Sequence, residues 1–199
     1  MGVDPTGARE FYAALFGWRF RPEGDRGYHL ILRDGEIVGG LGPAPAGPRF
    51  GTAWSVYLAA KDLDAARDRA AAHGARVLVP GVPAGGNGRL ALAVDPAGAP
   101  FGLWQGAHEE GVVLVDEPGA LSGAVLHSPR PAASEDFYRA VCGTSITAQQ
   151  GAEARWLPRF GVTDGAAFEE RARAAGATVR GPGLLSDPWG AVFGHLELP

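Results

Sequence analysis

Residues 95–105 read DPAGAPFGLWQ, and the stretch recurs near the C-terminus at residues 187–197 as DPWGAVFGHLE. Each copy joins an Asp-Pro-x-Gly turn to an alternating apolar segment that is long enough to cross a sheet. In such a turn proline fixes φ and glycine accepts a positive φ. The sequence therefore predicts the same turn and strand twice, in a fold that is built twice.

Other motifs recur in the same order, which supports an internal repeat. They are Phe11-Tyr12 with Gly17, which match Phe137-Tyr138 with Gly143, and Trp54, Asp62 and Gly74, which match Trp156, Asp164 and Gly176. The separation of matching residues shrinks along the chain. We therefore expect the second copy to have lost roughly two dozen residues after its first helix, and roughly ten more before its last strand.

Length and composition indicate an ordinary globular protein. The 199 residues suit two domains of about 100 residues or one of about 200. Hydrophobic residues make up 46% and charged residues 20%, and the net charge is -4. No basic block exists to neutralise phosphates and no apolar run has the length of a membrane span, so we expect neither a nucleic-acid nor a membrane partner. The one cysteine, Cys142, fits a reducing cytoplasm.

Hydrophobic periodicity predicts the elements of the first half. A helix begins at Asp4-Pro5 and ends at Gly17, and strands follow at 18–21, 28–32 and 36–41, with Asp34-Gly35 as a type I′ hairpin turn. A second module then shows strand 54–60, helix 62–73 and strands 76–79, 89–94 and 100–105. The second module is βαβββ, whereas the first is αβββ and lacks an opening strand.

The second half repeats this pattern in a shorter form. Its predicted elements are strand 121–127, helix 131–141, strand 156–162, helix 165–175 and strands 178–180 and 191–198. Residues 144–153 are too few for three strands. We therefore predict a domain at 1–106, an acidic linker at 107–119 and a shortened second domain at 120–199.

Together, the paired βαβββ modules, the Phe-Tyr-x-x-x-x-Gly helix end and the Asp-Pro-x-Gly strand resemble the vicinal oxygen chelate superfamily. This is the group of glyoxalases, bleomycin-resistance proteins and extradiol dioxygenases, and the tandem layout is similar to its actinobacterial hydroxylase or 27 kDa antigen-like branch. The resemblance implies an α+β fold of curved mixed sheets with helices on their convex side. It is specific for fold and poor for function, because that fold hosts many chemistries.

The same resemblance implies a metal on the concave face, held by the opening strands and by a Glu in the last strand. This sequence departs from that pattern. Gly102 and Gly194 stand where the Glu would be, and Ser55 and Gly123 stand at opening-strand ligand positions. Neither residue type offers the imidazole or carboxylate of a catalytic site. We expect no standard metal site and no cofactor, and we identify no catalytic residue.

Strand alternation predicts what replaces the metal site. Trp104 shares a face with Gly102, and Tyr57 shares one with Ser55. A cavity with a glycine floor and aromatic walls suits a small, partly apolar ligand. The predicted ligand-binding residues are therefore Ser55, Tyr57, Gly102 and Trp104, and the alternative is that both rings are ordinary core.

Further chemical candidates carry less weight. His195 and Glu197 resemble a ligand pair, but alternation places them on the face opposite Gly194. His127 is in phase with Gly123 and could reach the rim of a second cavity, which we expect to be collapsed. Cys142 is expected to be an inert buried thiol, and no partner can be named for His29.

Three functions stay open at this point. The first is a metal-free protein that binds a small organic ligand, as in the bleomycin-resistance branch. The second is a lyase, isomerase or oxygenase with a nonstandard metal site, and the third is a truncated, inactive copy. The missing opening strand adds the expectation of an exposed sheet edge, through which the protein could self-associate unless the coding sequence begins upstream of Met1.

Overall fold

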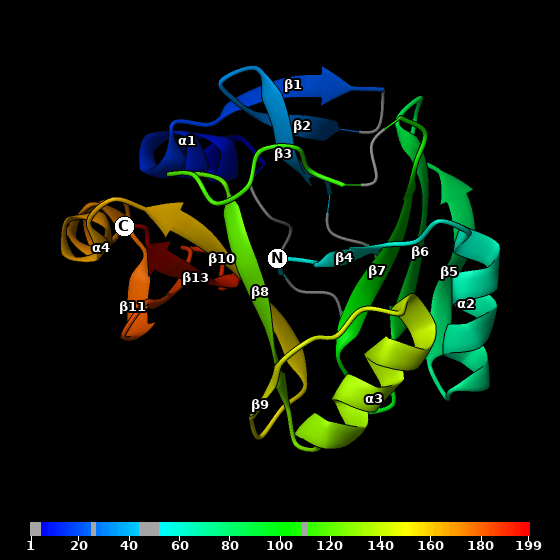
Figure 1. The fold of residues 1–199 in the computed structure, drawn as a ribbon. Helices are drawn as coiled ribbons and strands as arrows, with labels where there is room; N and C mark the ends of the chain where they lie inside the picture. Colours follow the sequence, from blue (N-terminus) through cyan, green and yellow to red (C-terminus); the bar gives the residue numbers. More distant parts are fainter. Residues whose placement is uncertain (1–4, 25–26, 44–51, 109–110) are drawn as a thin grey trace. The chain divides into compact units, whose positions relative to one another are not determined.

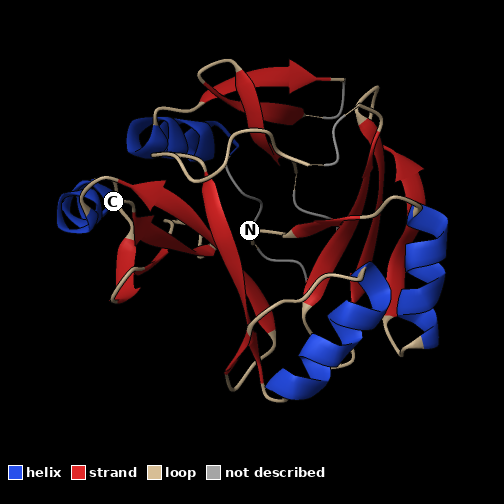
Figure 2. Ribbon diagram, in the orientation of Figure 1, coloured by secondary structure: helices blue, strands red, loops and turns tan. Residues whose placement is uncertain are grey.

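The computed structural model describes residues 5–24, 27–43, 52–108 and 111–199, and over these residues it shows an α+β fold (Figures 1 and 2). The helices are α1 (Pro5–Phe16), α2 (Leu63–Ala72), α3 (Pro131–Cys142) and α4 (Gly165–Ala174). The repeated Asp62 and Asp164 are the N-caps of α2 and α4, and each side chain accepts a backbone N–H three residues on, at 3.0 and 2.9 Å. Glycines with positive φ, Gly17 (72°) and Gly143 (68°), follow α1 and α3.

The strands of the first half are β1 (Arg19–Glu23), β2 (Tyr28–Arg33), β3 (Glu36–Leu41), β4 (Tyr57–Ala59), β5 (Arg76–Pro83), β6 (Gly88–Val94) and β7 (Pro100–Gly106). Those of the second half are β8 (Leu121–Ser128), β9 (Ala148–Gln150), β10 (Arg155–Val162), β11 (Thr178–Gly181), β12 (Leu184–Ser186) and β13 (Val192–Glu197). The β2–β3 turn has positive φ at Asp34 (51°) and Gly35 (93°), which confirms the predicted hairpin.

Sheet order repeats between the modules. Strands β4-β7-β6-β5 form one sheet, in which the opening strand β4 runs parallel to the last strand β7. The series β11-β12-β13-β10-β8-β9 contains the same arrangement, with β10 parallel to β13. Strands β1-β2-β3 form a third, antiparallel sheet. The repeated pairing of the opening strand with the last strand explains why Trp54, Asp62 and the Asp-Pro-x-Gly turn recur together in the sequence.

Internal contacts group the chain into two compact units that both draw on the two halves of the sequence. Unit 1 comprises Met1–Trp54, Val112–Gly123 and Pro158–Pro199, and unit 2 comprises Ser55–Gly111 and Ala124–Leu157. Strands β8 and β10 contribute residues to both. The predicted linker at 107–119 divides the modules by their order along the chain, and this domain boundary stays a prediction. The contacts instead group the first module with the last, and the second module with the third.

Each unit has its own hydrophobic core. In unit 1, Phe11, Tyr12 and Phe16 of α1 pack with Phe160 and Phe193. In unit 2, α2, β7 and α3 enclose a separate core, whose largest fully buried side chains are Leu63, Phe101, Leu103, Leu126 and Tyr138. Burial of large apolar side chains is the main stabilising contribution, so each unit is held together by residues far apart in sequence.

Most predicted elements are confirmed within one to four residues at their ends. Three details were wrong. Neither β9 nor β12 was predicted, and β4 covers only Tyr57–Ala59 of the expected strand 54–60. The short β12 pairs with β13 through Leu184↔Gly194, Leu185↔Phe193 and Ser186↔Val192. Tertiary pairing, not local pattern, makes these three residues a strand.

Two expectations about the ends of the fold remain. The description begins at Pro5, so the predicted lack of an opening strand concerns residues outside the described range. Strand β1 lies at an edge of its sheet, and self-association through an edge stays a prediction. Among the described residues, no helix combines the length and apolar character that a bilayer crossing demands.

Candidate functional site

The sheet of unit 2 has one face packed against helices and one open face. Register places Tyr57, Gly102 and Leu92 side by side, and Ala59, Trp104 and Leu90 in the next row. The alternate residues point the other way: Leu103, Ala91 and Phe101 are buried at 1–2% exposure in the core with α2. The open face is therefore mostly apolar, and its rim residue Tyr57 is 41% exposed.

The ring of Tyr57 lies directly over Gly102. A Cβ built at Gly102 would overlap the Cδ1, Cε1 and Cγ atoms of that ring. Position 102 therefore requires glycine, because the Tyr57 ring fills the space that any larger side chain would occupy. Trp104, two residues on, is partly exposed on the same face.

The predicted site residues are only partly brought together. Tyr57, Gly102 and Trp104 share the open face by register. Ser55 is exposed but precedes β4, so no strand register fixes its side chain. These four positions stay a prediction as a ligand site.

The corresponding position in unit 1 is also unsuited to a metal. Arg159 of β10 is the register partner of Gly194 of β13, as Tyr57 is of Gly102. A Cβ at Gly194 would lie 3.1 Å from Arg159 Cγ and 3.2 Å from the Gly183 carbonyl oxygen. A guanidinium carries permanent positive charge and cannot ligate a cation.

The side chains at the positions where the family resemblance places metal ligands therefore do not fit a divalent metal. Within the described ranges, no group of three or more His, Cys, Asp or Glu side chains lies close enough to hold one. Gly123 has open space around its Cα and offers no donor atom from a side chain. No chemical step can be derived through a metal at these residues.

The repeated Tyr, Trp and Asp motifs form one buried network in each unit. In unit 2, Tyr138 donates to Asp95 Oδ2 at 3.1 Å and accepts from Trp156 Nε1 at 3.0 Å. The other carboxylate oxygen of Asp95 accepts three backbone N–H groups of its turn at 2.8–2.9 Å. Burial and the negative charge of Asp95 raise the pKa of Tyr138, so its hydroxyl stays protonated and acts as a donor.

Unit 1 holds the same network. Tyr12 donates to Asp187 Oδ2 at 2.8 Å and accepts from Trp54 Nε1 at 3.1 Å. Both tyrosines and both aspartates are at most 4% exposed, so these groups cannot touch a ligand from solvent. The most strongly repeated motifs of the sequence are therefore structural: they anchor the Asp-Pro-x-Gly turn to the helix of another module.

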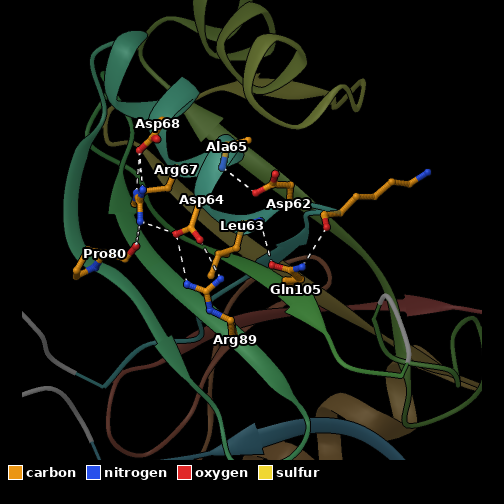
Figure 3. Close-up of polar contacts among 10 residues, drawn as sticks. Asp62, Leu63, Asp64, Ala65, Arg67, Asp68, Pro80, Arg89 and Gln105 are labelled. Carbon is orange, nitrogen blue, oxygen red and sulfur yellow. Dashed lines mark hydrogen bonds and ion pairs between the residues drawn. The ribbon is translucent and has the colours of Figure 1, made fainter.

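Polar contacts between α2 and the strands of the unit 2 sheet are structural too (Figure 3). Asp64 accepts from Arg67 at 2.7 Å and from Arg89 at 3.0 Å, and hydrogen bonding to Arg89 lowers the pKa of that carboxyl. Gln105 accepts from the Leu63 backbone N–H at 3.1 Å and donates to the Lys61 carbonyl at 3.1 Å. Gln105, which follows Trp104, thus joins β7 to the start of α2.

The remaining candidates have structural partners. His195 Nε2 lies 3.2 Å from Oε1 of Glu169 in α4, and Glu197 accepts a hydrogen bond from the Gly165 N–H at 2.9 Å. These contacts confirm that both residues point toward α4, away from the Gly194 face. Burial raises the pKa of the Cys142 thiol to about 11, as expected for an unreactive thiol. His127 pairs in register with Gln149 on β9.

Neither of two hollows within the units is lined by Tyr57, Gly102 or Trp104. The smaller, of about 50 Å³, lies in unit 2 beside Pro96 and Phe137. The larger, of about 570 Å³, lies in unit 1 between α1 and the β1–β2 hairpin. Sequence reasoning missed it because Arg9 and His29, its central polar residues, are 20 positions apart and match no motif.

Comparison with known proteins identifies the family. The model of the glyoxalase-like domain matches residues 3–104, about half of the chain. The chain belongs to the glyoxalase-like family. Membership places it in the vicinal oxygen chelate superfamily, as the repeated modules indicated.

Named proteins are among the relatives of this glyoxalase-like chain. CFP32 of Mycobacterium tuberculosis (strain CDC 1551 / Oshkosh), which is named provisionally as a glyoxylase, is 30% identical over 98% of this chain and 91% of its own length. The anthracycline biosynthesis protein DauV of Streptomyces sp. (strain C5) is 28% identical over 98% of this chain and 90% of its own length.

Solved structures share the glyoxalase-like fold. The Mn(II)-bound glyoxalase from Novosphingobium aromaticivorans has a TM-score of 0.63 at 17% identity, over 96% of this chain and 77% of its own. A variant of homoprotocatechuate 2,3-dioxygenase from B. fuscum has a TM-score of 0.63 at 16% identity, over 97% of this chain and 67% of its own. At this identity the likeness shows the α+β fold alone.

Proposed function

We propose that this glyoxalase-like protein binds a small, largely apolar organic ligand on the open sheet face of unit 2, without a metal. The observation that carries the proposal is the Tyr57 ring over Gly102, in register with Leu92 and beside Trp104. Aromatic and aliphatic side chains on an accessible face can bury a ligand of matching character. The single cysteine, Cys142, supports a cytoplasmic location as part of the same proposal.

The names of relatives support a small organic ligand. One is named as a provisional glyoxylase and others as anthracycline biosynthesis proteins, so the family includes proteins named for small organic molecules. The side chains at the aligned ligand positions favour binding over metal-dependent catalysis, because glycine, tyrosine and arginine replace carboxylate and imidazole donors. An enzyme with a nonstandard metal site, or an inactive copy, is the outcome if the test below fails.

The test is a screen of small, uncharged aromatic and aliphatic compounds by thermal shift, in buffer that contains a metal chelator. Affinities of the compounds that bind are then compared between the wild type and Trp104→Ala. Loss of a large aromatic contact should weaken binding by about tenfold or more. Tyr57→Ala should also weaken it, since the ring forms the rim of the face.

Tyr28→Ala is the matched control. Tyr28 is 41% exposed, as is Tyr57, and its ring also lies over a glycine, Gly40, but it belongs to unit 1. The proposal expects Tyr28→Ala to bind as the wild type does. Binding that survives Trp104→Ala, binding only in the absence of chelator, or no binding compound at all would each contradict it.

A further inference from the structure

The hollow of about 570 Å³ in unit 1 combines apolar walls with basic side chains. Helix α1 contributes Arg9 and Ala13, the start of the hairpin contributes Trp18, Arg19 and Phe20, and β2 contributes His29. The hollow is wide open to solvent, and its volume lies within the range of small-molecule sites, about 300–1,000 Å³. It belongs to unit 1, so it is distinct from the sheet face proposed above.

Arg9 is fixed in place by neutral groups. Its Nη1 lies 2.6 Å from His29 Nε2, and because a guanidinium can only donate, the imidazole nitrogen accepts. The other ring nitrogen of His29 lies 3.2 Å from the Gly27 carbonyl oxygen and therefore carries the proton. Arg9 also donates to Thr6 Oγ1 at 3.3 Å. The guanidinium is thus oriented by an uncharged imidazole and a hydroxyl.

The positive charge of the hollow is not balanced. In the part of the chain that the structure describes, neither Arg9 nor Arg19 forms an ion pair with a carboxylate. The lining includes two arginines and one acidic residue, Glu10, which forms no ion pair in those ranges either. An arginine that keeps free donors beside an apolar surface favours a carboxylate, to which it can bind through two hydrogen bonds.

The rest of the wall is apolar. Phe20 is half-buried and Ala13 lies on the adjacent helix face, while the Trp18 indole N–H is already engaged by the Gly119 carbonyl at 2.6 Å. Trp18 is only 3% exposed, so it backs the wall from the core and offers no free donor. A ligand that filled this wall would need an apolar or aromatic body attached to its anionic group.

We propose that this hollow is a binding site for a small organic carboxylate with an apolar or aromatic body. The carboxylate pairs with Arg9, assisted by the exposed Arg19, and the body packs against Phe20 and Ala13. His29 is a positioning residue, because it holds the guanidinium and need not touch the ligand.

The experiment uses the full chain and three probes: benzoate, its neutral isostere benzamide, and inorganic phosphate. Binding is followed by two-dimensional NMR of the ¹⁵N-labelled protein, where the Trp18 indole N–H and the backbone of Ala13 and Phe20 report on the site. The proposal expects benzoate to shift these signals, and benzamide and phosphate to bind at least about tenfold more weakly.

Arg9→Gln keeps a side-chain donor near His29 while it removes the charge. It should lower the affinity for benzoate by about tenfold or more. If that variant does not fold, Arg19→Gln gives a second reading, because Arg19 is exposed and its loss should weaken benzoate several-fold. Arg139→Gln is the control, since Arg139 is an exposed arginine of unit 2, and it should leave the affinity unchanged.

Equal affinity for benzoate and benzamide would overturn the proposal. So would phosphate binding as tight as benzoate binding, or benzoate affinity that none of the arginine changes in unit 1 reduces. Benzoate shifts confined to residues around Trp104 would also overturn it and would assign the carboxylate to the other unit.

Discussion

Replacing Tyr138 with phenylalanine tests whether the repeated motifs stabilise the fold. The Tyr138 hydroxyl is fully buried, donates to Asp95 at 3.1 Å and accepts from Trp156 at 3.0 Å. A hydrogen bond to a charged group contributes about 1.5–3 kcal/mol, and an unsatisfied buried N–H costs about 1–3 kcal/mol. Asp95 keeps three backbone donors, so the charge stays partly compensated. We expect Tyr138→Phe to lower the free energy of unfolding by about 2–4 kcal/mol.

Urea unfolding followed by tryptophan fluorescence measures this change. Tyr28→Phe is the control, because Tyr28 is 41% exposed and loss of its hydroxyl should alter stability by less than about 0.5 kcal/mol. Trp156→Phe in the Tyr138→Phe background should cost less than in the wild type, since the two groups act as one network. A loss for Tyr138→Phe no larger than for Tyr28→Phe would refute the structural role of the motif.

Three further changes test other parts of the account. Gly102→Ala should lower the free energy of unfolding by about 1–3 kcal/mol, because its Cβ would overlap the Tyr57 ring, whereas Tyr57→Ala should remove most of that penalty; equal costs in both backgrounds would contradict the packing. Cys142 should react with iodoacetamide at pH 8 about a hundredfold more slowly than a free thiol, because burial raises its pKa to about 11, and a rate like that of a free thiol would be inconsistent with this burial. The hydrogen bond from His195 lowers the pKa of Glu169, so Glu169 stabilises the fold above the unfolded pKa of about 4.3, and that contribution is lost as pH falls through the folded value. Glu169→Gln should therefore flatten the loss of stability in acid, and an unchanged pH profile would disprove the linkage.

Local sequence signals predicted most elements. Asp34-Gly35 marked the β2–β3 hairpin, and Asp62 and Asp164 marked the starts of α2 and α4, because turn and cap chemistry depends on a few adjacent residues. The repeat of the Asp-Pro-x-Gly stretch identified the family fold. These features need no knowledge of distant contacts.

The grouping of modules into compact units could not be read from the sequence. Tyr12 bonds to Asp187, 175 positions away, and Tyr138 bonds to Asp95, 43 positions back. The sequence contains the Phe-Tyr motif twice and the Asp-Pro-x-Gly motif twice, and it does not show which tyrosine pairs with which aspartate. Which turn anchors which helix is decided by packing in the two cores.

For the candidate site, the sequence predicted only which residues share a face of the sheet, because strand alternation gives no more than that. Alternation put Tyr57, Gly102 and Trp104 on one face, and register agrees. It could not show that the Tyr57 ring covers Gly102, because side-chain direction along the sheet depends on rotamers. Nor could it show that Arg9 binds His29, because that contact joins a helix face to a strand with no shared motif.

Metal content is the most direct test of the claim that this glyoxalase-like chain works without a divalent ion. The protein should be purified without chelators and its Mn, Fe, Ni and Zn measured by elemental analysis. Glycine at 102 and 194, with Tyr57 and Arg159 as their register partners, leads us to predict no stoichiometric metal. About one tightly held metal per chain, lost on substitution of Tyr57 or Arg159, would contradict the account.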